Sequence, residues 1–244
     1  MNETLVFEVR NQIARIILSN PENKNALSLE MIKELISSLE KIEWEGSENV
    51  KFALIEGSGD YFCSGFDLSC IEKYREVGSD KILEEIFLFA KLLRKFSSLP
   101  FPAIARIRGG AIGSGVGLLS TLDYIITEES SKFSIPEIKS GIVPAITALY
   151  LSRKIGLSNL ACFLLSGEEV NSEEALRMGL IHKITGRGDF QKESNCVEEQ
   201  FLSLSPQALR KMKQILLKAF PLPKTELEEY CAMQTAESII SSGD

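Results

Sequence analysis

The start of the chain alternates apolar and polar residues in a pattern that predicts a hairpin followed by a helix. Alternation runs over residues 5–10 and again over 13–18, on either side of Asn11-Gln12, as is typical of two paired strands. After a polar loop, Ser28 is a suitable helix N-cap, because its hydroxyl can accept a hydrogen bond from the first turn. Apolar residues then recur at helical spacing, so we expect an amphipathic helix that ends near residue 44.

Strands and helices continue to alternate over the first 135 residues, and helices dominate the rest of the chain. Further strands are expected over 51–56, 103–107 and 124–127, and further helices over about 80–96, from the glycine-rich stretch 109–117 through 122, and around 145–155, 158–165, 172–178, 206–220 and 224–239. This alternation predicts an α/β fold. We expect a core unit over residues 1–189 and a helical region over 190–244 that belongs to the same domain.

Composition and charge argue against several classes of function. With 244 residues, of which 44% are hydrophobic, the chain can bury a substantial core. Its net charge of −7 leaves no excess of cations to neutralise phosphates, which argues against a nucleic-acid binder. No apolar run approaches the roughly 18 residues of a membrane span. The first residues also lack the features of a secretory signal.

Cysteine and histidine usage points to a reducing compartment and to a site without metal. The five cysteines are an odd number without paired spacing, which indicates reduced thiols and a cytoplasmic location. There is one histidine, His182, and neither a C-x-x-C nor an H-E-x-x-H motif, so we expect no metal centre.

Five motifs give the chain a specific resemblance. They are PENKNALSLEM (21–31), GSGDYFCSGFDLS (57–69), AIARIRGGAIGSGVGLLSTLDY (103–124), FSIPEIKSGIVP (133–144) and SPQALRKMK (205–213). In order and spacing, over nearly the whole chain, they resemble the enoyl-CoA hydratase/isomerase (crotonase) family. The resemblance implies a spiral of ββα units with a helical C-terminal region that trimerises, and therefore a homotrimer or a hexamer of two stacked trimers.

The resemblance implies that two backbone N–H groups bind the carbonyl oxygen of a thioester. One donor follows the glycine of the family's S-G-x-D motif and falls on Phe66, and the other comes from the glycine-rich turn and falls on Ser114. Two such donors in a dry site stabilise the negative charge that develops on the oxygen during proton transfer. Because backbone atoms do this, the side chains of Phe66 and Ser114 do not conflict with the role. Taken alone, Gly65 also fits an ordinary turn.

The resemblance also implies one catalytic acid instead of two. Family hydratases place two glutamates across the bound enoyl thioester; the first aligns with Gly117 and the second with Glu137, in Pro136-Glu137. Adding water is well served by two carboxylates, whereas moving a double bond needs one base that removes a proton and returns it. Glu137 is therefore the candidate catalytic residue, although in isolation it also fits a solvated surface carboxylate. A catalytic role predicts a partly buried carboxyl with a raised pKa.

The same resemblance identifies the ligand as an acyl-CoA thioester or an acyl carrier protein thioester. The coenzyme A or phosphopantetheine arm is expected to lie against two loops, whose residues are Lys24, Ala26, Leu27, Cys63, Ser64, Gly65, Phe66, Asp67 and Leu68. No cofactor is expected, because coenzyme A arrives as part of the substrate.

Three interpretations of function remain open. The favoured one is a single-glutamate enoyl-CoA isomerase of the kind used in fatty acid metabolism. The second is an enoyl-CoA hydratase or 3-hydroxyacyl-thioester dehydratase, including the polyketide type, because Ala145-Ile146-Thr147 follow Pro144 where the family commonly has glycines. The third is a crotonase-fold protein that binds a thioester or a partner without catalysis.

Overall fold

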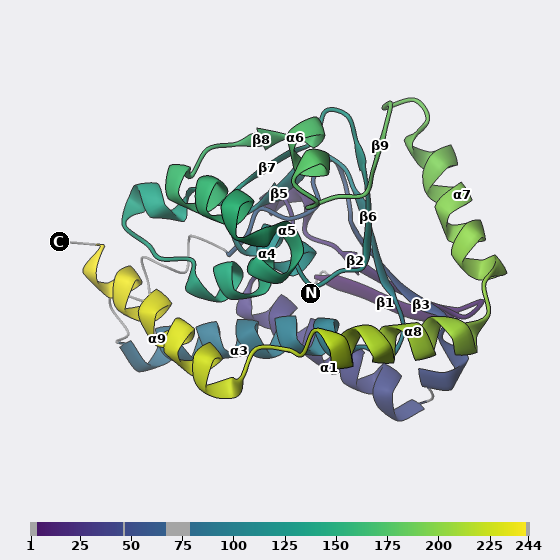
Figure 1. Ribbon diagram of the computed structural model, residues 1–244, viewed down its shortest axis with the longest axis horizontal. Coiled ribbons are helices and arrows are strands. Elements are labelled where there is room, and N and C mark those ends of the chain that lie inside the picture. The colour runs from purple at the N-terminus through teal and green to yellow at the C-terminus, as the bar shows by residue number, and fades with distance from the viewer. Residues whose placement is uncertain (1–3, 46, 67–78, 243–244) are drawn as a thin grey trace.

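The computed structural model describes residues 4–45, 47–66 and 79–242 and contains one six-stranded sheet (Figure 1). Its strands are β1 (Leu5–Arg10), β2 (Ile13–Leu18), β3 (Phe52–Gly57), β4 (Ala103–Ile107), β6 (Tyr124–Glu128) and β9 (Lys183–Thr185), in the order β1-β2-β3-β4-β6-β9. Strand β1 is antiparallel to β2, and the remaining neighbours are parallel. The expected hairpin is confirmed. Asn11 and Gln12 both have positive φ, as a tight two-residue hairpin turn requires.

A second, three-stranded sheet carries the glycine-rich stretch. It consists of β5 (Gly110–Ile112), β7 (Lys132–Ser134) and β8 (Val170–Asn171), in the order β5-β7-β8. These strands are only two or three residues long, which is too short for alternation to be visible in the sequence. In Figure 1 they lie beside the main sheet, on the side away from α7.

Helices cover both faces of the main sheet. They are η1 (Pro21–Asn23), α1 (Leu29–Glu45), η2 (Ser47–Asn49), α3 (Ser79–Ser98), α4 (Ser114–Leu119), η3 (Pro136–Ser140), α5 (Ala145–Ser166), α6 (Ser172–Arg177), α7 (Phe190–Ser203), α8 (Pro206–Ala219) and α9 (Thr225–Ser241). The expected cap is present, because the Ser28 hydroxyl accepts a hydrogen bond from Met31 N–H at 3.2 Å. No described helix has both the length and the apolar composition that crossing a membrane requires.

Two helix boundaries differ from the sequence prediction in an informative way. The helix expected through residue 122 ends at Leu119, because the Ser120 and Thr121 hydroxyls donate to the carbonyls of Gly117 and Leu118 and close the chain into turns. The two helices expected around 145–155 and 158–165 are continuous in α5 except at Gly156, where φ is 71° and ψ is 158°. The prediction of a break was therefore correct in its position.

The main hydrophobic core lies between one face of the sheet and helices α1 and α3, which run beneath it in Figure 1. The inward residues of β3 on this face, Ala53 and Ile55, alternate with Phe52 and Leu54 on the other face. A smaller cluster there includes Val197 of α7. Both faces of the parallel strands are thus buried, as is usual for parallel sheets.

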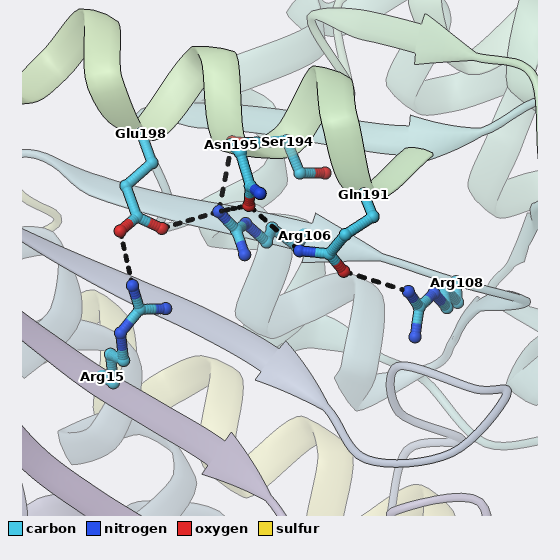
Figure 2. Close-up of polar contacts among 7 residues, drawn as sticks. All are labelled: Arg15, Arg106, Arg108, Gln191, Ser194, Asn195 and Glu198. Carbon is cyan, nitrogen blue, oxygen red and sulfur yellow. Dashed lines mark hydrogen bonds and ion pairs between the residues drawn. The ribbon is translucent and has the colours of Figure 1, made fainter. Parts of the chain in front are cut away.

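Helix α7 is attached to the sheet by a buried ion-pair network, shown in Figure 2. Glu198 accepts hydrogen bonds from Arg15 of β2 at 2.5 Å and from Arg106 of β4 at 2.6 Å. The Arg106 guanidinium also reaches Ser194 O and Asn195 Oδ1. Arg106 is only 7% exposed, and burial lowers its pKa while the charge of Glu198 opposes that effect. A buried arginine of this kind depends on its carboxylate.

Removing the Glu198 charge should therefore destabilise the protein. We expect Glu198→Gln to lower the free energy of unfolding by about 2–3 kcal/mol, because it removes the carboxylate that is hydrogen-bonded to the buried Arg106 charge. Glu169→Gln is the matched control, since the Lys132–Glu169 pair is 60% and 51% exposed and should contribute less than about 1 kcal/mol. Urea unfolding of the three proteins measures both values, and equal effects of the two substitutions would contradict the assignment.

Candidate functional site

A cavity of about 260 Å³ lies at the end of β5, between η3 and the helices α3, α5 and α9. It is lined by Ser64, Gly65, Phe66, Ile86, Phe89, Ile112, Gly113, Ser114, Pro136, Glu137, Lys139, Ser140, Ile142, Pro144, Ile146, Thr147, Thr235 and Ile239. Most of these side chains are apolar, and a few polar groups converge among them, which is the usual character of a small-molecule site. The predicted residues Phe66, Ser114 and Glu137 are all among them.

Two backbone segments meet closely at the floor of this cavity. Gly65 has a φ of 91°, and a Cβ atom placed on it would lie 2.8 Å from Ile112 O and 3.3 Å from Ser114 N. The segment is held on both sides, because Leu27 N–H donates to Gly65 O at 2.7 Å and Ile112 N–H donates to Cys63 O at 3.0 Å. Only glycine fits this approach at this φ.

The approach leaves two N–H groups available at the cavity wall. Phe66 follows Gly65 directly, and Ser114 is the first residue of α4, where backbone N–H groups have no partner within the helix. Within the described part of the chain, neither N–H donates to a backbone carbonyl. Two donors on facing segments are suited to bind one oxygen of a ligand.

The carboxyl group of Glu137 reaches the same place from the opposite side. Glu137 lies in the first turn of η3, with Pro136 before it. A Cβ atom placed on Gly113 would lie 2.2 Å from Glu137 Oε1, so the carboxyl rests on the backbone immediately before Ser114. Its Oε2 atom is buried and has no hydrogen-bond partner among the described residues. An unsatisfied buried carboxyl oxygen is unusual outside functional sites.

Burial sets the ionisation of this carboxyl. Loss of solvation raises the pKa of Glu137 from 4.5 to about 7, and a hydrogen bond from its own backbone N–H opposes the rise. The group therefore exchanges its proton near neutral pH, which suits a residue that both removes and returns a proton. The surroundings of Glu137 thus raise its pKa, as the sequence predicted.

The position of the second family glutamate is filled by other side chains. A Cβ atom placed on Gly117 would lie 2.8 Å from Thr147 Oγ1 and 3.0 Å from the Phe89 ring. Phe89 in turn packs edge-on against Phe66, with ring centroids 5.0 Å apart at 65°. The absent carboxylate is thus replaced by an aromatic ring and a hydroxyl, and Glu137 is the only carboxylate among the residues lining the cavity in the described chain.

Helix α9 closes the cavity with Thr235 and Ile239, a contribution that no sequence motif indicated. It is anchored by Glu228, which accepts hydrogen bonds from Arg94 Nε at 2.9 Å and from Tyr150 Oη. These partners lie on α3 and α5, so the buried network joins the three helices around the cavity. The contribution of α9 to the cavity wall depends on contacts between helices that are far apart in sequence, so only the three-dimensional structure reveals it.

Only some of the loop residues predicted to contact the coenzyme A arm line the cavity. Ser64, Gly65 and Phe66 line the cavity; Ala26 and Leu27 are buried beside them, and Leu27 forms a parallel bridge with Phe66. Asp67 and Leu68, also predicted to contact the arm, lie outside the described residues.

Two further loop residues differ in their exposure. Lys24 is exposed, with Nζ 5.6 Å from the centre of the Tyr61 ring. Cys63 is fully buried, and burial raises the pKa of its thiol to about 12; only its backbone serves the loop. Across the described residues, no group of three or more His, Cys, Asp or Glu side chains is arranged to hold a metal ion.

Comparison with known proteins gives a consistent result. The family model described as enoyl-CoA hydratase/isomerase matches residues 8–242. The enoyl-CoA hydratase domain-containing protein 3 of Xenopus laevis is 28% identical over 245 residues, covering 97% of this chain and 82% of that protein. The crystal structure of the human protein of that name superimposes with a TM-score of 0.82 at 27% identity, covering 96% and 90% of the two chains. The solved structure of Pseudomonas aeruginosa AtuE superimposes with a TM-score of 0.84 at 29% sequence identity, covering 97% of this chain and 92% of that chain.

The raised pKa of Glu137 has a measurable consequence for stability. Because the folded state retains a proton that the unfolded chain releases, the stabilisation is complete below pH 4.5 and is lost as the pH rises through about 7. Relative to Glu137→Gln, we expect the free energy of unfolding of the wild type to fall by about 3 kcal/mol from pH 4.5 to about pH 8. Urea unfolding at both pH values tests this, and a pH-independent difference would show that Glu137 is not buried as described. Glu85, whose pKa burial also raises to about 7, is common to both proteins and cancels.

Proposed function

Because the chain belongs to the enoyl-CoA hydratase/isomerase family, we propose that it is an enzyme that moves a double bond along the acyl chain of a coenzyme A thioester. Glu137 carries the proton in this reaction, and the N–H groups of Phe66 and Ser114 bind the thioester carbonyl oxygen. The support is the buried carboxyl and the two donors that border one cavity.

The proposed reaction needs one base and one oxyanion site. The Glu137 carboxylate removes a proton from carbon 2 of a 3-enoyl thioester, and the electron pair moves into the carbonyl to give a dienolate. The Phe66 and Ser114 N–H groups stabilise the negative oxygen, each donor contributing about 3 kcal/mol or more in comparable sites. Glu137 then returns the proton to carbon 4, the carbonyl reforms, and the product is the conjugated 2-enoyl thioester.

The observation that carries this proposal is the filled space beside Gly117. Hydration is well served by a water held between two carboxylates, and the Phe89 ring and Thr147 occupy the place from which the second would extend. Migration of a double bond requires no water. The described cavity wall contains one carboxylate whose pKa of about 7 suits both removal and return of a proton.

A second candidate is a hydratase or a 3-hydroxyacyl-thioester dehydratase, on coenzyme A or on a carrier protein. The Thr147 hydroxyl, which lines the cavity, favours it over a plain hydrocarbon isomerase, because it could contact an oxygen on the acyl chain. A non-catalytic binding role is less well supported, since the Phe66 ring packs on Phe89 and leaves the backbone N–H at the cavity. Loss of water from a 3-hydroxyacyl thioester at a rate above the isomerisation rate would favour the dehydratase.

The remaining parts of the proposal concern ligand and location. The coenzyme A arm lies over Lys24, Ala26 and Leu27, and the exposed Lys24 ammonium is available to a phosphate. No further cofactor is required. The odd number of cysteines supports a reducing, cytoplasmic location. Residues 1–189 form the core unit, and residues 190–244 form a helical region of the same domain that supplies contacts for assembly and, through Thr235 and Ile239, part of the cavity wall.

Assembly as a trimer, or as two stacked trimers, is supported by apolar side chains on the surface of the C-terminal helices. Met212, Ile215 and Phe220, on α8 and at its end, are 55%, 57% and 66% exposed. Exposed apolar side chains on one element indicate a protein interface. We expect light scattering to give three or six times the mass of one chain. Ile215→Glu should reduce it, while Gln214→Glu, at an exposed polar neighbour, should not.

The catalytic role of Glu137 is tested by the isosteric substitution Glu137→Gln. We expect it to lower the rate of 2-enoyl-CoA formation from 3-enoyl-CoA by about 10²–10⁴, while binding of a saturated acyl-CoA is unchanged. In the wild type kcat/KM should rise with pH and level off above about pH 7, because the base must be deprotonated. Undiminished turnover by Glu137→Gln would exclude the proposal.

A further inference from the structure

Thr147 presents a hydroxyl to the cavity that makes no hydrogen bond to another described residue. It is 4% exposed and lies in the first turn of α5, and its side chain lines the cavity. Among the described residues Oγ1 makes no hydrogen bond. The usual acceptor for a helical threonine is the carbonyl four residues earlier, which here belongs to Val143, a residue that precedes the start of α5.

A second threonine in the same cavity provides the contrast. The Thr235 hydroxyl donates to Cys231 O, four residues earlier, at 3.1 Å and accepts from Ala145 N–H at 3.2 Å. Its hydrogen bonds are therefore satisfied inside the protein and it has no need of a ligand. Thr147 lacks such hydrogen bonds, although both side chains are mostly buried and both line the cavity. Thr147 Oγ1 is not among the fully buried unpaired atoms of the described residues, so it is accessible from the cavity and free to pair with a polar group that enters there.

The position of Thr147 in the cavity indicates which part of a bound ligand its hydroxyl would contact. Its Oγ1 lies 2.8 Å from the place that a Cβ atom on Gly117 would occupy. Gly117 belongs to α4, and the first residue of that helix, Ser114, supplies one of the proposed donors to the carbonyl oxygen. The neighbouring wall, formed by Ile86, Phe89 and Ile146, is apolar. With the thioester carbonyl at Ser114 N–H, the hydroxyl faces the acyl chain.

We propose that Thr147 binds an oxygen on the acyl chain, so that the enzyme's substrates are thioesters with a hydroxyl or keto group on that chain. This inference rests on the proposed thioester site. A hydroxyl can both donate and accept, so it pairs with either group. An acyl carboxylate is disfavoured because it would share the cavity with the Glu137 carboxylate.

Binding to matched ligands tests the inference. The probes are a saturated six-carbon acyl-CoA and the same thioester with one hydroxyl on carbon 3, 4 or 5, titrated calorimetrically into Glu137→Gln so that none turns over. We expect at least one hydroxylated thioester to bind about threefold to tenfold more tightly than the unsubstituted one, the worth of one hydrogen bond. Adding Thr147→Val, which has the same shape, should abolish this preference, and Thr147→Ser should retain it. Thr235→Val should also retain it.

The outcomes separate the two proposals. Equal binding of hydroxylated and plain thioesters, or a preference that survives Thr147→Val, overturns the role of Thr147 and leaves the thioester site intact. Failure of every coenzyme A thioester to bind overturns the proposed function and this inference with it. Thermal unfolding of each variant distinguishes a lost hydrogen bond from a lost fold.

Discussion

The close approach of backbone segments around Gly65 and Gly113 is the constraint on which the site depends. At both positions φ is positive, and a Cβ atom would collide with Ile112 O at 2.8 Å in one case and with Glu137 Oε1 at 2.2 Å in the other. The small sheet maintains this geometry, because Gly113 N–H donates to Ser134 O at 2.8 Å, and the chain then leads through η3 to Glu137. Without side chains between them, the segments place two N–H donors and one carboxyl around the same small space.

Exclusion of water has two linked effects in this space. It penalises the charged form of Glu137 and raises its pKa to about 7, and it strengthens the attraction between N–H donors and a negative oxygen, because the local dielectric is low. A more solvated Glu137 would be a weaker base with a lower pKa, and in the proposed reaction more solvated N–H donors would stabilise the negative oxygen less. Burying a carboxyl oxygen without a hydrogen-bond partner destabilises the folded protein. In the proposed reaction the same burial keeps that oxygen available to take up a proton.

The sequence indicated the motif-bearing segments that border the cavity, but it did not indicate which helices form the other walls. Helices α1 and α3 follow from apolar spacing, and Glu137 follows from a local motif, since both signals lie within a short stretch of chain. The roles of Phe89 and Thr147 depend on helices α3 and α5 meeting at Gly117, and that of Thr235 depends on α9 folding back over α5. Such contacts join residues far apart in sequence, so periodicity carries no information about them. The short strands β5, β7 and β8 were missed because two or three residues show no period.

This division between local and distant signals corresponds to a division of chemical tasks. In the proposed reaction, the segments that carry the motifs supply the groups that contact the thioester carbonyl and move the proton. Helices α3, α5 and α9 supply the walls around the acyl chain, and they are held together by the Arg94–Glu228–Tyr150 network rather than by the glycine-rich turn. A change on these helices can therefore alter which acyl chain is accepted without disturbing the proton chemistry. Gly117 is an exception to this separation: under the proposed alignment it stands where family hydratases have an acid, and Phe89 and Thr147 from the walls fill the space beside it.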